Sequence, residues 1–131
     1  MTYKINKAQF DAIVRLPGPD RYRHFIKRVA DSSRVWTLKH SEGFVTMGDD
    51  KENILVPLWP HADYAKAIAT GEWSSCNPEE IDLDSFIEKW IPGMIEKGYF
   101  VAIFPTPNEK GIVVQPGQLF ADLQEELKNY E

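Results

Sequence analysis

Apolar residues recur along this chain first with the period of a helix and then with the period of strands. A first helix is predicted to start after Asn6, because Asn6 can cap it and Gln9 stands where a capping box places Glu or Gln. A second helix is predicted over 20–32, where apolar residues recur at i, i+3, i+4, i+7 and i+8 from Tyr22. Together the two patterns predict a helical hairpin.

The segments that follow predict short strands. Segments 34–40 and 43–48 are expected to pair through a hairpin-length loop, and 54–59 is expected to form a third strand. Pro57 cannot donate a ladder hydrogen bond, so this third strand should lie at an edge or end nearby. A later run, 99–104, is apolar at every position, which is typical of a central strand covered on both faces.

Helices are predicted on either side of a polar loop. Pro60 suits the first turn of a helix, with His61 in the same turn. Residues 72–81 are expected to form an irregular loop, and an apolar stripe with helical period covers 83–97. Pro92 should kink or break that second helix.

The order of the predicted elements is ααβββααββα, with a last strand near 112–115 and a last helix from Pro116. This order predicts a single α+β domain over residues 1–131, in which helices pack a five-stranded mixed or antiparallel sheet. A length of 131 residues is enough for one such domain and too short for two.

Composition indicates where in the cell the protein is expected. No stretch approaches the roughly 18 apolar residues that a membrane helix needs, and the start of the chain lacks the apolar core of a signal peptide. Cys76 is the only cysteine, so no internal disulfide can form, as is usual in the cytoplasm. We therefore expect a cytoplasmic protein that does not associate with membranes.

The net charge of −5 conceals an asymmetry. Residues 1–40 carry nine Lys or Arg and three Asp, whereas residues 41–131 carry six Lys and seventeen Asp or Glu. The two parts can attract one another within the fold, or the basic part can meet an acidic partner. On the second predicted helix, Arg21, Lys27 and Arg28 lie away from the apolar stripe and form an outer basic face.

Residue patterns that would indicate catalysis, a cofactor or a metal are missing from the sequence. His24, His40 and His61 are spaced too far apart for the short-range histidine pairs of a metal site. There is no GxSxG nucleophile motif and no glycine-rich phosphate loop. We therefore predict no catalytic residue, no metal and no cofactor.

The four tryptophans divide into two pairs. Trp36 shares a strand face with Leu38, and Trp90 lies on a helical apolar stripe, so both are predicted to be in the core. Trp59 and Trp73 flank the helix after the third strand, and we expect both to be partly buried at an edge where a partner can bind. The residues predicted to contact a partner are Trp59, His61, Trp73, Arg21, Lys27 and Arg28.

Five segments of the chain carry a resemblance. They are "RYRHFIKRVADSSRVWTL", "LVPLWPHADYAKAIATGEW", "IDLDSFIEKWIPGMIEKG", "VAIFPTPNEKGIVVQP" and "LFADLQEELKNYE". Together they cover most of residues 20–131 and resemble a small bacterial family, domain-of-unknown-function family number 2750. The resemblance implies no activity and no catalytic residues. In layout alone, the Pro-bearing strand that feeds a helix is also similar to SseB-like bacterial domains, which implies an interaction module.

Three hypotheses follow from the sequence. The first is a non-enzymatic protein-interaction module, with an immunity-type role as one form of it, acting as a monomer or homodimer. The second is an enzyme with a site near His61 and the loop 73–76. The third is nucleic-acid binding through the basic face of the second helix, which the sequence pI near 5.2 disfavours.

Overall fold

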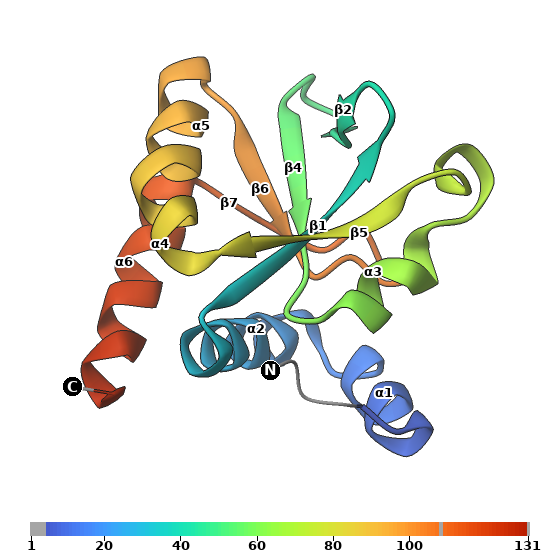
Figure 1. Cartoon of the computed structure of the whole chain (residues 1–131), viewed down its shortest axis with the longest axis horizontal. Helices are drawn as coiled ribbons and strands as arrows, with labels where there is room; N and C mark the ends of the chain where they lie inside the picture. Colours follow the sequence, from blue (N-terminus) through green and yellow to red (C-terminus); the bar gives the residue numbers. More distant parts are fainter. Residues whose placement is uncertain (1–4, 108, 131) are drawn as a thin grey trace.

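Two β-sheets that meet at one point organise the fold (Figure 1). The computed structural model describes residues 5–107 and 109–130. One sheet has the strand order β2-β1-β5, and the other has the order β3-β4-β6-β7. The strands are β1 (Arg34–His40), β2 (Gly43–Phe44), β3 (Met47–Gly48), β4 (Ile54–Leu58), β5 (Asn77–Asp82), β6 (Phe100–Ile103) and β7 (Ile112–Val114).

The two sheets are joined through Trp36 and Trp59. The backbone N–H of each donates to the C=O of the other, at N···O distances of 3.0 and 2.8 Å. Thr37 adds a second link, because its hydroxyl donates to the C=O of Pro57 at 2.8 Å. Away from this junction β1 and β4 diverge, as Figure 1 shows.

Helices pack around both sheets. They are α1 (Lys7–Val14), α2 (Gly18–Ser32), α3 (Ala62–Ile68), α4 (Leu83–Ser85), α5 (Ile91–Lys97) and α6 (Pro116–Leu127), with the short helical turns η1 (Gly71–Trp73), η2 (Phe86–Trp90) and η3 (Lys128–Tyr130). The segments α4, η2 and α5 follow one another directly and lead from β5 of one sheet to β6 of the other. None of the helices described has the length and apolar content that crossing a bilayer requires.

The predicted α+β class is confirmed, and so are several local features. Asn6 caps α1, because its Oδ1 accepts the N–H of Gln9 at 2.8 Å while Gln9 Oε1 accepts the N–H of Asn6 at 3.2 Å. β6 lies between β4, its parallel neighbour, and β7, its antiparallel neighbour. It is therefore the central strand that its apolar sequence predicts.

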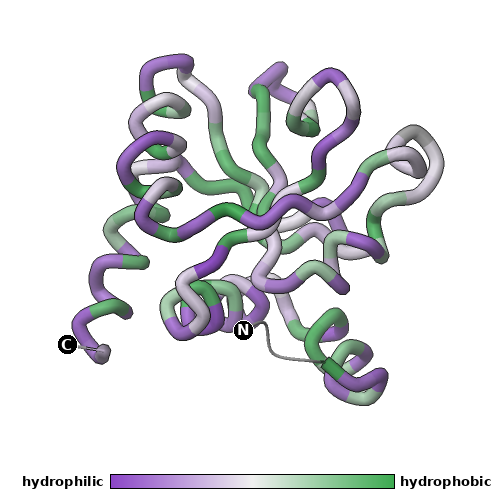
Figure 2. The backbone as a smooth tube through the Cα atoms, in the orientation of Figure 1, coloured by the Kyte–Doolittle hydropathy of each residue, from purple (hydrophilic) through white to green (hydrophobic). Residues whose placement is uncertain are grey.

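The prediction of one five-stranded sheet is wrong, because the described strands form one three-stranded and one four-stranded sheet. Segment 43–48 is divided between the two sheets, since β2 pairs with β1 and β3 pairs with β4. Segment 72–81, predicted to be irregular, contributes η1 and most of β5, which pairs with β1 along its whole length from Arg34–Asp82 to Lys39–Asn77. β5 is largely hydrophilic where β4 and β6 are hydrophobic (Figure 2), because it is an edge strand with little buried surface.

The prolines act close to where they were predicted to act. β4 pairs with β3 only at Ile54 and Leu55, so Pro57 has a paired strand on one side alone, and β4 ends at Leu58. Ahead of Pro92, the segment η2 is a π-helical turn in which the N–H of Ile91 donates to the C=O of Phe86, five residues back. The predicted interruption at Pro92 is thus a widened turn inside a continuous helix.

Candidate partner-binding pocket

Trp59, predicted to be partly buried at a binding edge, is fully buried. Its indole Nε1 donates to the C=O of Pro105 at 2.8 Å, and its main chain joins the two sheets at Trp36. The expected exposure is therefore wrong, because the residue lies where the ends of β4 and β6 meet the other sheet.

His61 is also buried, with about one twentieth of its surface exposed (5%). It precedes α3 as the N-cap residue, and its Nδ1 accepts the N–H of Asp63 at 3.1 Å. The helix therefore begins at Ala62, and the prediction that Pro60 and His61 form its first turn is wrong by one or two residues. Nδ1 therefore acts as the acceptor that caps α3.

Trp73 is half-buried and lines two hollows. One, of about 400 Å³, also contains His40, Glu42 and Cys76, and the other, of about 260 Å³, contains Pro105 and Thr106. Neither hollow is lined by Trp59 or His61. The structure thus does not place the three predicted residues together in either of them.

The prediction that Arg21 lies on the outer face of α2 is wrong, because this residue is fully buried. Its Nε donates to the C=O of Phe104 at 3.3 Å, and its Nη1 donates to the C=O of Leu16 at 2.7 Å. The same Nη1 lies 3.1 Å from a carboxylate oxygen of Glu109. Arg21 is therefore an internal anchor for the loop after β6, since its donors satisfy two main-chain carbonyls and one carboxylate.

Lys27 is exposed on α2, whereas Arg28 is half-buried and lines a hollow together with residues of α1. Arg28 lies 3.8 Å from the carboxylate of Asp31, and Arg23 lies 2.7 Å from that of Asp20. With Arg21 buried and these two side chains paired, the basic face carries less free positive charge than the sequence indicated.

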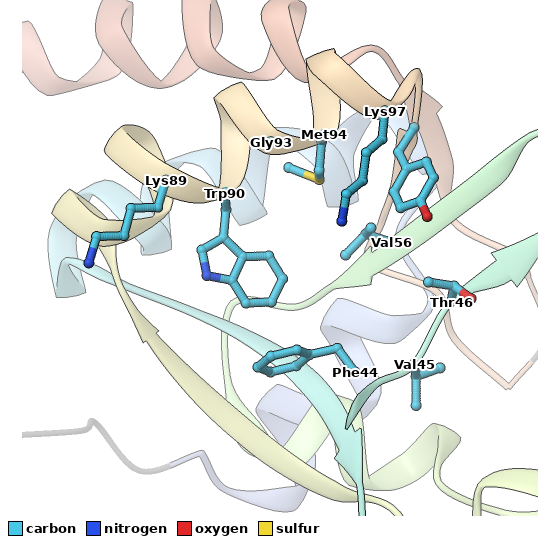
Figure 3. Close-up of a pocket in the computed structure, with 10 residues that line it drawn as sticks. Phe44, Val45, Thr46, Val56, Lys89, Trp90, Gly93, Met94 and Lys97 are labelled. Atoms are coloured by element: carbon cyan, nitrogen blue, oxygen red, sulfur yellow. The ribbon is translucent and has the colours of Figure 1, made fainter. Parts of the chain in front are cut away.

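A pocket that the sequence did not point to lies where the two sheets diverge. The helical segments η2 and α5 cross from the three-stranded to the four-stranded sheet, and they form one wall of the pocket, which has a volume of about 430 Å³ (Figure 3). We call it the η2–α5 pocket. Its lining residues are Phe44, Val45, Thr46, Val56, Lys89, Trp90, Gly93, Met94, Lys97 and Tyr99.

Aromatic and apolar side chains form the interior of the η2–α5 pocket. Phe44 and Trp90 contact one another in the lining (Figure 3), with ring centroids 4.7 Å apart and ring planes at 75°. This edge-to-face geometry is a favoured one for aromatic rings. Buried Val56 and Met94 contribute further apolar lining, while Phe44 is 41% exposed. The pocket is therefore apolar inside and open to solvent at Phe44.

Lysines surround this apolar interior. Lys89 and Lys97 lie at its two ends (Figure 3), and the Nζ of Lys39 lies 5.3 Å from the centroid of the Phe44 ring. All three side chains are exposed. Within the described ranges, no carboxylate lies within 4.0 Å of any of the three ammonium groups. The rim is thus positively charged in a protein of net charge −5.

The polar groups of the lining come from few residue types. No histidine, cysteine or carboxylate is among the residues described as lining the η2–α5 pocket, and its polar lining includes Thr46, Lys89, Lys97 and the hydroxyl of Tyr99. Over the part of the chain that the structure describes, no group of three or more His, Cys, Asp or Glu could hold a metal ion. The η2–α5 pocket thus combines an apolar interior with ammonium groups at its edge.

Sequence reasoning missed the pocket because it assigned Trp90 to the core and gave Phe44 no role. A signal was nevertheless present. Lys89, Gly93 and Lys97 recur every four residues beside the apolar stripe of this helix. Such spacing places a small residue between two lysines along one edge of the stripe.

Comparison with known protein families matches residues 22–123 to DUF2750, described as a protein of unknown function. The chain belongs to the DUF2750 family. The resemblance to family number 2750 seen in the sequence is thereby confirmed. Every residue that lines the η2–α5 pocket lies inside the matched range, whereas α1 lies outside it. No curated protein matches the chain.

Proposed function

We propose that this DUF2750 protein is a cytoplasmic, non-enzymatic interaction module that binds a segment of a partner protein in the η2–α5 pocket. One observation carries the proposal: an open, aromatic pocket between the two sheets, whose described lining contains no carboxylate, histidine or cysteine. Aromatic residues in such pockets dominate the binding energy of many protein interfaces. The cytoplasmic setting follows from the lone cysteine, Cys76.

The geometry of the pocket fits a side chain presented by a peptide. Its volume, about 430 Å³, lies within the range of sites that enclose a bound group. Phe44 stays 41% exposed although it contacts Trp90, so an incoming apolar group can cover surface that water now reaches. Covering apolar surface is worth about 25 cal/mol per Å². A partner side chain would therefore bind where both rings are accessible.

A displayed library of random peptides, selected on the purified protein, tests this proposal. Each recovered peptide is then titrated against the wild type and three variants. Phe44→Ser removes one aromatic wall, and Gly93→Leu fills the pocket from the helix, where a Cβ meets no atom within 4 Å. Val113→Ser is the matched control, because Val113 is 42% exposed but does not line the pocket.

The proposal predicts that recovered peptides bind wild type and Val113→Ser equally. They should bind Phe44→Ser and Gly93→Leu at least about tenfold more weakly, a loss of about 1.4 kcal/mol. Circular dichroism and unfolding curves establish that all variants are folded. Failure to recover any peptide, or peptides that bind Phe44→Ser and Gly93→Leu as tightly as wild type, would overturn the proposal.

A further inference from the structure

Three lysines at the edge of the η2–α5 pocket, Lys39, Lys89 and Lys97, indicate which kind of partner the pocket can bind. Lys89 is on η2, Lys97 is on α5 and Lys39 is on β1. Two contiguous helical segments and one strand distant from them in sequence thus bring ammonium groups to one apolar opening. None of the three has a carboxylate within 4.0 Å in the described chain. Each remains available to a charge supplied from outside.

We infer that the pocket binds an acidic peptide segment. One aromatic side chain of the peptide enters the pocket, and Asp or Glu residues stand on either side of it in the peptide sequence. This inference rests on the proposed function, because it names the chemistry of the partner at the same site. The aromatic group enters beside Phe44 and Trp90, while carboxylates on either side of it reach Lys89 and Lys97.

An aromatic anchor suits the interior better than an aliphatic one. Phe44 and Trp90 already meet edge to face at 4.7 Å, and a third ring can extend that arrangement. Met94 lies in the same wall (Figure 3), and a thioether sulfur makes favourable contacts with ring edges. The interior therefore offers aromatic and sulfur partners to one inserted ring.

Helix geometry sets the spacing of the acidic residues. Lys89 and Lys97 are eight positions apart on one helical run, which corresponds to about 12 Å along the axis. An extended peptide covers that length in about four residues, at roughly 3.3 Å each. The carboxylates should thus stand about two positions before and two positions after the aromatic residue, an arrangement that reaches both ends of the pocket from one anchor.

Defined peptides test the inference. The probe is Ser-Gly-Asp-Gly-Trp-Gly-Asp-Gly-Ser, with both termini blocked. The comparison peptides replace both Asp by Asn, both Asp by Lys, or Trp by Ala. Binding is measured by NMR shifts of the labelled full chain, which detect weak complexes, at about 50 mM and about 500 mM salt, concentrations between which the screening length falls severalfold.

The Asp peptide should shift amides around Phe44 and Trp90 and bind at least tenfold more tightly than the Asn peptide at low salt. The advantage should fall at least threefold at high salt. The Trp-to-Ala peptide should not bind. Lys89→Gln combined with Lys97→Gln should remove most of the preference for Asp over Asn, whereas Lys66→Gln, an exposed lysine on α3, should leave it unchanged.

Failure of the acidic-partner inference can be told apart from failure of the proposed peptide site. Equal or tighter binding of the Asn or Lys peptide, with loss of binding in Phe44→Ser, overturns the acidic partner and leaves the pocket as a peptide site. No binding of any of these peptides or of library peptides overturns both proposals. Displacement of the Asp peptide by an oligothymidylate that itself binds more tightly would assign the lysines to nucleic acid and overturn the inference.

Discussion

The guanidinium group of Arg21 holds three separate parts of the chain together inside the protein. Its partners are the carbonyls of Leu16 and Phe104 and the carboxylate of Glu109. Phe104 has a φ of 59°, in the left-handed region that residues other than glycine rarely adopt. A hydrogen bond to its carbonyl helps to hold that conformation where β6 ends.

Replacing Arg21 by Met should lower the free energy of unfolding by about 1–3 kcal/mol, because the buried carbonyl of Phe104 and the partly buried carbonyl of Leu16 lose their donor. Glu109 is half exposed, so its carboxylate can turn to water and adds little to the cost. Arg23→Met is the matched control, since the exposed Arg23–Asp20 pair should be worth less than about 1 kcal/mol. Denaturant titrations measure both; equal losses in the two variants would contradict the anchoring role.

His24 has an internal position that makes stability depend on pH. Its Nε2 is buried without a hydrogen-bond partner among the described residues. Burial, and secondarily the positive charge of Arg28, lower the pKa of His24 below its ordinary value of 6.5. The folded protein thus disfavours the protonated ring that the unfolded chain accepts freely.

His24 should therefore contribute stability above about pH 6.5 that is lost as the pH falls through the unfolded pKa toward the lower folded one. The unfolded state binds more protons in that window, so the free energy of unfolding decreases with acidification. His24→Leu should flatten this part of the curve, measured by urea unfolding between about pH 8 and pH 5. An acid limb as steep as that of the wild type would show that His24 is not its source.

Single residues also show where prediction from sequence stops. Arg21 stands four positions before Phe25, so helical spacing allows it to lie on the buried face, but its charge argued for the outside. The groups that make burial acceptable lie 83 and 88 positions further along the chain. Phe44 and Trp90 likewise meet only because two distant elements pack together. No local pattern encodes such pairings.

At the scale of elements, the sequence predicts correctly those helices and strands whose apolar residues follow one clear pattern. α2 and β6 have strong apolar patterns, and both form as predicted. β5 was missed because "NPEEID" is acidic and contains Pro78, so it lacks the alternation of a half-buried strand. Its pairing depends on β1, and Arg34 of β1 lies 2.7 Å from Glu80 and 3.3 Å from Asp82.

Two glycines in different elements should respond oppositely to alanine. Gly93 is helical in α5, and an added Cβ meets nothing within 4 Å, so Gly93→Ala should stabilise by about 0.5–1 kcal/mol. Gly111 has a φ of +96°, and a Cβ there would lie 2.9 Å from the C=O of Ile103. Gly111→Ala should therefore destabilise by at least about 1–3 kcal/mol.

Thermal unfolding separates the two effects. Gly93→Ala should raise Tm by roughly 2–4 °C, and Gly111→Ala should lower it by at least that much. A lower Tm for Gly93→Ala would indicate that the widened turn before Pro92 needs glycine. An unchanged Tm for Gly111→Ala would mean that the loop after β6 can relax at little cost.

At the scale of the whole molecule, the charge asymmetry acts partly inside the fold. Arg21 pairs with Glu109, and Arg34 pairs with Glu80 and Asp82, so basic residues before position 41 meet acidic residues after it. The α+β class followed from the order of elements. The division into two sheets did not, because it depends on where 43–48 changes its strand partner, and that segment has no burial pattern that distinguishes the two sheets.

The junction at Trp36 and Trp59 decides whether the two sheets unfold as one unit. The amide N–H of each donates to the C=O of the other across the sheets, whereas the N–H of Phe104 donates to the C=O of Leu58 within the four-stranded side at 2.8 Å. If residues 1–131 form one cooperative domain, as the sequence predicts, opening the junction requires global unfolding.

Native-state hydrogen exchange, followed by NMR across denaturant concentrations, measures this coupling residue by residue. The amides of Trp36, Trp59 and Phe104 should exchange with one common free energy, equal to that of global unfolding, because Trp59 and Phe104 are fully buried at the centre of the packing. The amide of Glu52, which donates to the C=O of Asp49 in an exposed turn, should exchange by a smaller local opening. If the Trp36 and Trp59 amides opened with a lower free energy than that of Phe104, the sheets would separate before the four-stranded side unfolds. The η2–α5 pocket, whose lining includes Phe44 of one sheet and Val56 of the other, would then widen without global unfolding.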